Sequence, residues 1–288
     1  MRPIYALLSL CAATSVAPAI ASSLEATHSG HAGTKMTAHS HISPALQAAV
    51  AAPNRSAANK ARDQYRHPAE TLSFFGVKPT DTVVEIWPGG GWYTEILAPY
   101  LRDNGKLIVA APAGRGSEAI GRFLDTDPTS YGKVARANFP QLMGGTRVPA
   151  GTADAVLTFR NVHNWRMGSY SADGNDYSVA AFQELYAMLK PGGVLGIEDH
   201  RLPEDASDAR ERSSGYIKVS TIRRLAEQAG FQFVGASEIN ANPNDTKDYP
   251  KGVWTLPPRL AEGDVNRDRY LAIGESDRMT LKFVKPAK

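Results

Sequence analysis

The sequence predicts an α/β protein with a doubly wound, mainly parallel sheet, and three observations point to this class. Short runs of β-branched and other apolar residues alternate with stretches whose apolar residues recur at helical spacing. The short runs lack polar alternation, as expected of strands buried on both faces. A glycine-rich turn follows the first run, and Pro-Gly punctuation ends a later helix just before a strand. This alternation is typical of parallel strands joined by right-handed helical crossovers.

The expected elements follow in chain order. We expect strands at 82–86, 106–110, weakly within 131–149, and at 154–159, 194–198, 231–236 and 279–284. We expect the intervening helices at 92–101, 119–124, 179–189 and 220–229. No convincing crossover helix separates the last two strands, so they should pair antiparallel and close a seven-stranded sheet. Between them lies a polar, Pro-rich insertion at 240–275.

Composition and charge exclude several classes of protein. The 288 residues are 42% hydrophobic and 21% charged, which fits a globular protein rather than a disordered or fibrous one. Lys and Arg number 32 against 29 Asp and Glu, and the basic residues are scattered rather than clustered. No nucleic-acid partner is therefore expected, because no basic stripe marks a phosphate track.

The N-terminus has the pattern of a secretory signal. Arg2 precedes an apolar run at 4–16, and Ala19-Ile20-Ala21 has the small residues of a cleavage site. The run is too short to anchor the mature chain, so we expect an exported protein, periplasmic or secreted, without stable membrane insertion. Cleavage after residue 21 would also remove Cys11, the only cysteine.

The mature chain begins with a polar segment at 22–43, for which we expect a flexible tether. Its four histidines match no closed metal site; they are His28, His31, His39 and His41. Residues 44–288 are expected to form a single domain. Helices within 44–80 should pack across the sheet edge or over the site as a lid.

The turn after the first strand is the candidate ligand loop. Ligands of open α/β sheets bind beyond the carboxyl ends of the strands. Gly89, Gly90 and Gly91 would let a ligand approach the backbone there. Glu85, at the strand end, is placed to interact with the ammonium group of an amino-acid ligand, through the loop or a water.

Residues 85–91 resemble the acidic-x-Gly-x-Gly-x-Gly motif of class I S-adenosylmethionine-dependent methyltransferases, with Glu85, Gly89 and Gly91 matching. The turn at 189–193 is similar to the one before the fifth strand of those enzymes. Four further stretches resemble a group of exported bacterial methyltransferases: 65–68, 85–94, 160–165 and 198–201. The resemblance covers about residue 54 to the C-terminus. It implies a Rossmann-like fold, S-adenosylmethionine as cofactor and methyl transfer to an unidentified, small-molecule acceptor.

The chain departs from the family pattern at two positions. Trp87 replaces the first glycine of the motif, and the second strand ends in Ala110-Ala111-Pro112, where the family has an acidic residue for the ribose hydroxyls. Losing that pairing would cost about 1.5–3 kcal/mol of cofactor affinity. These departures favour an alternative, a non-catalytic small-molecule binding protein on the same fold. A third hypothesis, a nicotinamide-dependent oxidoreductase, ranks last because the glycine spacing differs.

Three residues are candidates for the chemistry. His163 follows one expected strand, and Asp199 and His200 end the neighbouring one, so their side chains should converge. Either histidine could act as a general base, oriented by Asp199 or Glu198. The alternatives are that both histidines only hydrogen-bond loops, or that the three residues form a metal site, although their spacing is of no known ligand type.

Two further residues complete the candidate cofactor site. The resemblance implies that Asn161 contacts the methionine part of the donor, although an asparagine there also suits a turn cap. Tyr93 is placed to flank the adenine or the acceptor, or simply to pack. The sequence leaves the acceptor and the oligomeric state open.

Overall fold

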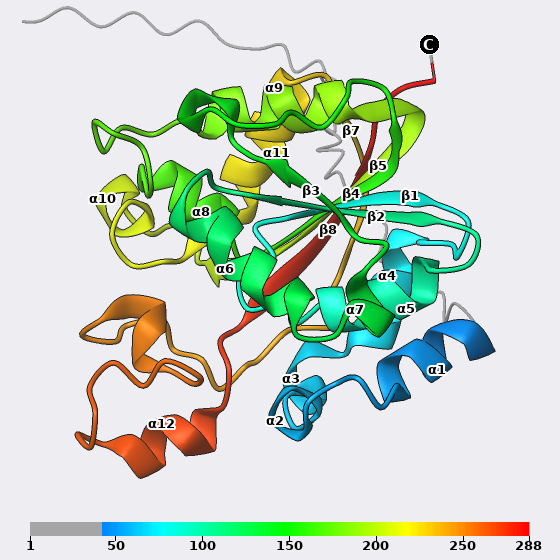
Figure 1. The fold of residues 1–288 in the computed structure, drawn as a ribbon. Coiled ribbons are helices and arrows are strands. Elements are labelled where there is room, and N and C mark those ends of the chain that lie inside the picture. Colours follow the sequence, from blue (N-terminus) through cyan, green and yellow to red (C-terminus); the bar gives the residue numbers. More distant parts are fainter. Residues whose placement is uncertain (1–41, 288) are drawn as a thin grey trace, which may run out of the picture. The chain divides into compact units, whose positions relative to one another are not determined.

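The computed structural model describes residues 42–287, which are built around one mixed sheet (Figure 1). The expected signal peptide, and all but the last two residues of the expected tether, lie outside the described residues. The strands are β1 (Thr82–Ile86), β2 (Lys106–Ala111), β3 (Ala135–Asn138), β4 (Ala153–Phe159), β5 (Leu189–Leu202), β6 (Ile217–Lys218), β7 (Gln232–Ser237) and β8 (Arg278–Val284).

Helices and short turns of helix connect these strands. They are α1 (Pro44–Ala51), α2 (Ala57–Lys60), α3 (Asp63–Arg66), α4 (Pro68–Phe75), α5 (Thr94–Leu101), α6 (Arg115–Asp125), α7 (Pro128–Tyr131), η1 (Gln141–Met143), α8 (Val162–Arg166), α9 (Ser178–Met188), α10 (Asp208–Glu211), α11 (Val219–Gln228), η2 (Gly252–Thr255) and α12 (Arg267–Ile273). Within residues 42–287 no helix combines the length and the apolar character needed to cross a bilayer.

The strand order confirms the predicted fold class. The sheet runs β3-β2-β1-β4-β5-β8-β7, and the short β6 pairs with β5 beside this path, one strand more than expected. The strands β1 to β5 pair in parallel, whereas β8 lies antiparallel between β5 and β7. The order reverses between β1 and β4, which is where a doubly wound sheet opens a crevice for a ligand.

Helices cover both faces of the sheet, because its central strands carry apolar side chains on both sides. On one face α9 and α11 pack through Phe182 and Ile222. On the other face α4 and α5 pack through Phe75 and Ile96. Figure 1 shows these two layers on opposite sides of the strands. The sheet is thus buried between two helix layers, and the loops at the strand ends can form a binding site.

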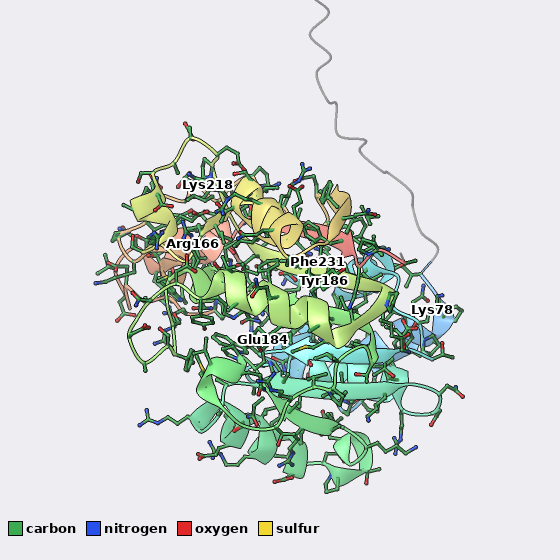
Figure 2. All side chains as sticks on the ribbon, turned by 90° about the horizontal axis from the view of Figure 1, so that it is seen from above. Lys78, Arg166, Glu184, Tyr186, Lys218 and Phe231 are labelled. Carbon is green, nitrogen blue, oxygen red and sulfur yellow. The ribbon has the colours of Figure 1, made fainter. Side chains whose placement is uncertain are left out.

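The helix α9 also reaches the antiparallel end of the sheet. Figure 2 shows Tyr186 of α9 beside Phe231, which directly precedes β7, and the two rings lie 5.1 Å apart edge to face. The Lys285 ammonium lies over the Tyr186 ring and donates to the Tyr186 carbonyl oxygen at 2.9 Å. These contacts join the last strand pair to the crossover helix.

The strand β5 is longer at both ends than the predicted 194–198. At its start Leu189 pairs with Ala153 of β4, and the Gly192 N–H donates to the Lys285 carbonyl, so the expected turn continues as strand. At its other end β5 keeps pairing with β8 as far as His200. This extension carries Asp199 and His200 past the end of β4, toward the crevice.

The N-terminal helices and the insertion lie at the crevice end of the sheet. The helix α4 begins at Pro68, whose fixed φ suits a first turn, and it ends at Phe75, followed by the capping residue Gly76 with φ +79°. The weak edge strand expected within 131–149 is β3. The insertion at 240–275 contains η2 and α12, drawn in orange in Figure 1.

Candidate functional site

A cavity of about 360 Å³ lies beyond the carboxyl ends of β1, β4 and β5. Its walls come from the loop after β1, the end of β4, the end of β5, the helices α2 and α3, and the insertion. Its volume falls in the range of about 300–1,000 Å³ that small-molecule sites occupy. Six of the nine residues predicted from sequence line it: Glu85, Gly89, Gly90, Tyr93, Asn161 and His200.

The three loop glycines have different surroundings. A Cβ added at Gly89 or Gly90 would meet no atom within 4 Å, so both leave open space beside the cavity. A Cβ at Gly91 would lie 2.5 Å from the ring of Phe123 on α6, and Gly91 has φ +83°. Gly91 therefore allows close packing of α6 against the loop and does not line the cavity.

Glu85 is a buried carboxylate at the end of β1. It is 2% exposed and accepts a hydrogen bond from the Thr94 hydroxyl at 2.6 Å. Burial raises the pKa of Glu85 to about 7, against the opposing effects of the Thr94 hydrogen bond and of Arg160. The carboxyl group is thus poised between its two protonation states at neutral pH, and a cationic ligand would favour the ionised form.

Trp87 forms a wall of the cavity and leaves it open. Its backbone has φ +50°, an uncommon conformation for a bulky residue. The indole N–H donates to the Phe139 carbonyl at 2.9 Å, and the ring packs edge to face on Trp165 and Tyr170. The strand end at 110–112, where the family carries its acidic residue, does not contribute to the cavity lining.

Asn161 and Tyr93 are held by neighbouring strands. The Asn161 amide donates to the Ile86 carbonyl at 3.0 Å, which ties the end of β4 to the end of β1. The Tyr93 ring stacks on Phe159 with centroids 3.5 Å apart, and its hydroxyl donates to Glu198 at 3.2 Å. Both side chains are therefore fixed before any ligand arrives.

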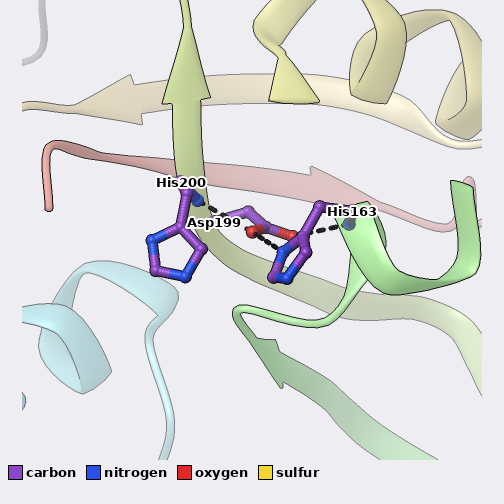
Figure 3. A group of neighbouring side chains, drawn as sticks. All are labelled: His163, Asp199 and His200. Carbon is purple, nitrogen blue, oxygen red and sulfur yellow. Dashed lines mark hydrogen bonds and ion pairs between the residues drawn. The ribbon is translucent and has the colours of Figure 1, made fainter. Parts of the chain in front are cut away.

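His163, Asp199 and His200 converge, as the strand order requires (Figure 3). The His163 Nδ1 lies 2.7 Å from Asp199 Oδ1, and both residues are buried. The backbone N–H of His163 donates to Asp199 Oδ2 and that of His200 to Oδ1. Asp199 therefore fixes the His163 ring, and His163 lies behind His200 rather than on the cavity wall.

His200 is the histidine that lines the cavity. Its Nδ1 lies 2.5 Å from the Ser276 hydroxyl, and its ring centre lies 5.1 Å from that of His163. Burial, followed by His163 and Arg160, lowers the pKa of His200 well below its ordinary value. The imidazole is consequently neutral at pH 7, with one ring nitrogen unprotonated, and it is a weaker base than a free histidine.

The same three residues offer ligand atoms within 4.8 Å of one another, close enough to share a metal ion. The two Asp199 oxygens, however, already accept three hydrogen bonds from His163 and His200. The Nδ1 contact with Asp199 leaves the Nε2 of His163 free, so the same geometry serves an oriented histidine and a metal-binding histidine backed by a carboxylate.

The cavity is flanked by a buried network of arginines and glutamates that was not predicted from the sequence. Glu275 accepts from Arg62 at 2.7 Å, Arg66 at 2.9 Å and Arg278 at 3.2 Å. Glu198 pairs with Arg278 at 3.0 Å and Arg160 at 3.3 Å. Sequence gave no local signal for it, because its members lie on α3, β4, β5 and the β8 end, up to 213 residues apart.

Comparison with known proteins shows which solved structures share this fold. No protein-family model and no curated protein matches the sequence. A SAM-dependent methyltransferase from Aquifex aeolicus has a TM-score of 0.52 at 14% identity, over 78% of this chain and 93% of that one. The cyclase SpnF has a TM-score of 0.55 at 15% identity, over 84% and 92%.

The chain has the class I methyltransferase fold. Phosphoethanolamine N-methyltransferase 2 of Haemonchus contortus, solved with S-adenosyl-L-methionine, also shares it, with a TM-score of 0.50 at 15% identity over 77% of this chain and 53% of that one. Identities this low establish the fold alone, and SpnF shows that the class I methyltransferase fold also serves a cyclase. The reaction must therefore be argued from the site.

Proposed function

We propose that this chain transfers a methyl group from S-adenosylmethionine to a small-molecule acceptor bound in the 360 Å³ cavity. The observation that carries the proposal is the meeting of a buried carboxylate, two open glycines and a neutral histidine at the point where the strand order reverses. We also propose that the protein is exported, as a member of the bacterial group that it resembles, with residues 1–21 as its signal.

The cavity residues fit the amino-acid end of S-adenosylmethionine. Glu85 offers an anion for the ammonium group, and Arg66 and Arg160 offer cations for the carboxylate. Gly89 and Gly90 leave room for the donor against the backbone. The adenosine end would lie past Trp87. Residues 110–112, at the end of β2, carry no carboxylate for the ribose hydroxyls, so we expect most of the affinity to come from the amino-acid end.

The donor supplies an electrophilic methyl group on its sulfonium. The chain's own contribution is to place the acceptor in line with that group and to exclude water, which together lower the barrier substantially. In the tautomer whose Nδ1–H donates to the Ser276 hydroxyl, His200 can accept the acceptor's proton at Nε2. His163, fixed by Asp199, is a positioning residue that packs behind the His200 ring.

Replacing His200, the proposed base, should lower the rate of methyl transfer without weakening ligand binding. We expect His200→Gln to lower kcat about 10²–10⁴-fold for an acceptor that carries its proton. Binding of the demethylated product, S-adenosylhomocysteine, should change little. The measurement is transfer from methyl-labelled S-adenosylmethionine to a panel of small molecules, with His67→Gln as the matched control outside the cavity. Equal kcat for wild type and His200→Gln would refute the role of the base.

The titration of Glu85 predicts how product binding depends on pH. Its pKa of about 7 exceeds the ordinary value of 4.5, so below pH 7 the group is mostly protonated and cannot pair with an ammonium. Affinity for S-adenosylhomocysteine should therefore rise up to about tenfold per pH unit between pH 5 and pH 7. Calorimetry over this range tests the slope, and Glu85→Gln should flatten it. An unchanged slope in that variant would show that another group is responsible.

The same titration predicts a stability change of opposite sign. Because the folded pKa lies above the unfolded one, the stabilisation from protonated Glu85 is full below pH 4.5 and is lost as pH rises through 7. Without a ligand, the protein should therefore gain stability from Glu85→Gln above pH 7. This gain follows from removing a carboxylate that burial disfavours.

A further inference from the structure

The cavity holds more positive than negative charge. Four arginines line it, namely Arg62, Arg66, Arg160 and Arg259, but only two carboxylates, Glu85 and Glu275. The pair formed by Arg278 and Glu198 behind the wall adds no net charge. Asp199, behind His200, adds one negative charge, so the cavity carries an excess of at least one positive charge, and of two when Glu85 is protonated.

The excess positive charge lies on arginine side chains that lack a full set of carboxylate partners. The Arg62 Nη2 is buried and has no hydrogen-bond partner within residues 42–287. Burial, followed by the charge of Arg160, lowers the pKa of Arg66 to about 9, although Glu275 opposes this shift. Arg259, on the insertion, is exposed and pairs with no carboxylate in the described part of the chain. Buried donors without partners are costly, which suggests that a ligand supplies the missing acceptors.

The methyl donor does not supply the missing charge. S-adenosylmethionine brings one carboxylate but also an ammonium and a sulfonium, so its net charge is positive. Its carboxylate can pair with an arginine, yet the total positive charge in the cavity increases. The compensating negative charge must then come from the other substrate.

We propose that the acceptor carries an anionic group, a carboxylate or a phosphate, which binds between Arg62 and Arg259 at the insertion side of the cavity. This inference rests on the proposed function and specifies its substrate class. Guanidinium groups recognise both anions through paired hydrogen bonds, so carboxylate and phosphate share the chemistry. The group would hold the acceptor at the end of the cavity formed by η2 and the segment after it.

A neighbouring cavity also has more basic than acidic residues in its lining. A second cavity, of about 920 Å³, shares Trp254 and Arg259 with the first. It is lined by three further cations, Arg210, Lys247 and Lys251, and by one acid, Asp248. Like charges gathered along an opening raise the local concentration of oppositely charged small molecules and speed their association. An anionic acceptor would thus be attracted to the side of the site where Arg259 lies.

The test titrates inorganic phosphate and succinate, in separate calorimetry experiments, into the protein saturated with S-adenosylhomocysteine. We expect at least one of the two anions to bind saturably, and Arg259→Gln and Arg62→Gln each to weaken it about tenfold, as the loss of one charge-assisted hydrogen bond would. The control is Arg269→Gln, an exposed arginine of the same insertion that lines neither cavity; its affinity should equal that of wild type. Whichever anion binds more tightly identifies the group.

Two results would overturn the proposal. One is saturable binding of S-adenosylhomocysteine with no binding of either anion, which would leave methyl transfer standing but remove the anionic acceptor. The other is anion binding that falls equally in the Arg269→Gln control, which would place the anion elsewhere on the surface. Failure of S-adenosylhomocysteine itself to bind would instead contradict the proposed function, and titrating the anions into the free protein would still test the arginines.

Discussion

Glu275→Gln should lower the free energy of unfolding by about 3–5 kcal/mol, the range found when one partner of a buried ion pair is removed. Glu275 is 4% exposed and is the shared carboxylate of Arg62, Arg66 and Arg278. A neutral amide leaves Arg62 and Arg66 without their anion, and leaves Arg278 with Glu198 alone. The network joins α3 to the end of the insertion, so its loss should also loosen the cavity wall.

Urea unfolding at pH 7 measures this effect, with Glu227→Gln as the control. Glu227 pairs with Arg223 at 3.7 Å on the surface of α11, so the control should change stability by less than about 1 kcal/mol. Burial alone would raise the pKa of Glu275, but Arg66 and Arg278 outweigh it and lower the pKa to about 2. The stabilisation is therefore full above pH 4.5 and is lost as pH falls toward 2, a loss that Glu275→Gln should not show. A change in stability similar to that of the control would refute the role of the network.

Gly90→Val should weaken binding of S-adenosylhomocysteine by about 1–3 kcal/mol, roughly 5- to 150-fold, because it overfills the cavity. Gly90 lines the cavity, is not in the left-handed region, and has no atom within 4 Å of an added Cβ. The Cβ of a valine would thus find open space beside the ligand, and its two methyl groups would fill part of that space. Gly89 is less suitable because its φ of +59° would add backbone strain to any substitution.

The matched control is Gly235→Val, on the edge strand β7. Gly235 likewise lies outside the left-handed region and has no atom within 4 Å of an added Cβ, but it is remote from the cavity lining. Calorimetry of both variants, with thermal unfolding as a check on folding, separates loss of the ligand space from loss of the fold. Equal affinities for the two variants would mean that the ligand does not lie against the glycine loop.

The fold could be predicted because short stretches of sequence indicate most of its strands and helices. Buried strands such as 82–86 and 154–159 stand out as apolar, β-branched runs, and the missing crossover helix before 279–284 predicted the antiparallel end. The two-residue β6 gave no such pattern, since it forms only because β5 extends past the sheet to meet it. Strand length is thus decided by partners that lie far away in the sequence.

The candidate site was predictable only where it follows from strand order. Glu85, Asp199 and His200 stand at strand ends, so the topology brought them to one edge. Gly90 borders the cavity, whereas Gly91 packs on α6. This difference depends on tertiary contacts and could not be predicted from the sequence. Glu275 was likewise not recognised, because two of its three arginine partners, Arg62 and Arg66, come from the other end of the chain.

The most direct test is a crystal structure of the protein grown with saturating S-adenosylhomocysteine. We predict that its amino-acid end will lie in the 360 Å³ cavity, with the ammonium group near Glu85 and the backbone of Gly89 and Gly90 alongside. A structure in which that cavity contains only solvent, or in which the nucleoside binds at a different edge of the sheet, would contradict the account.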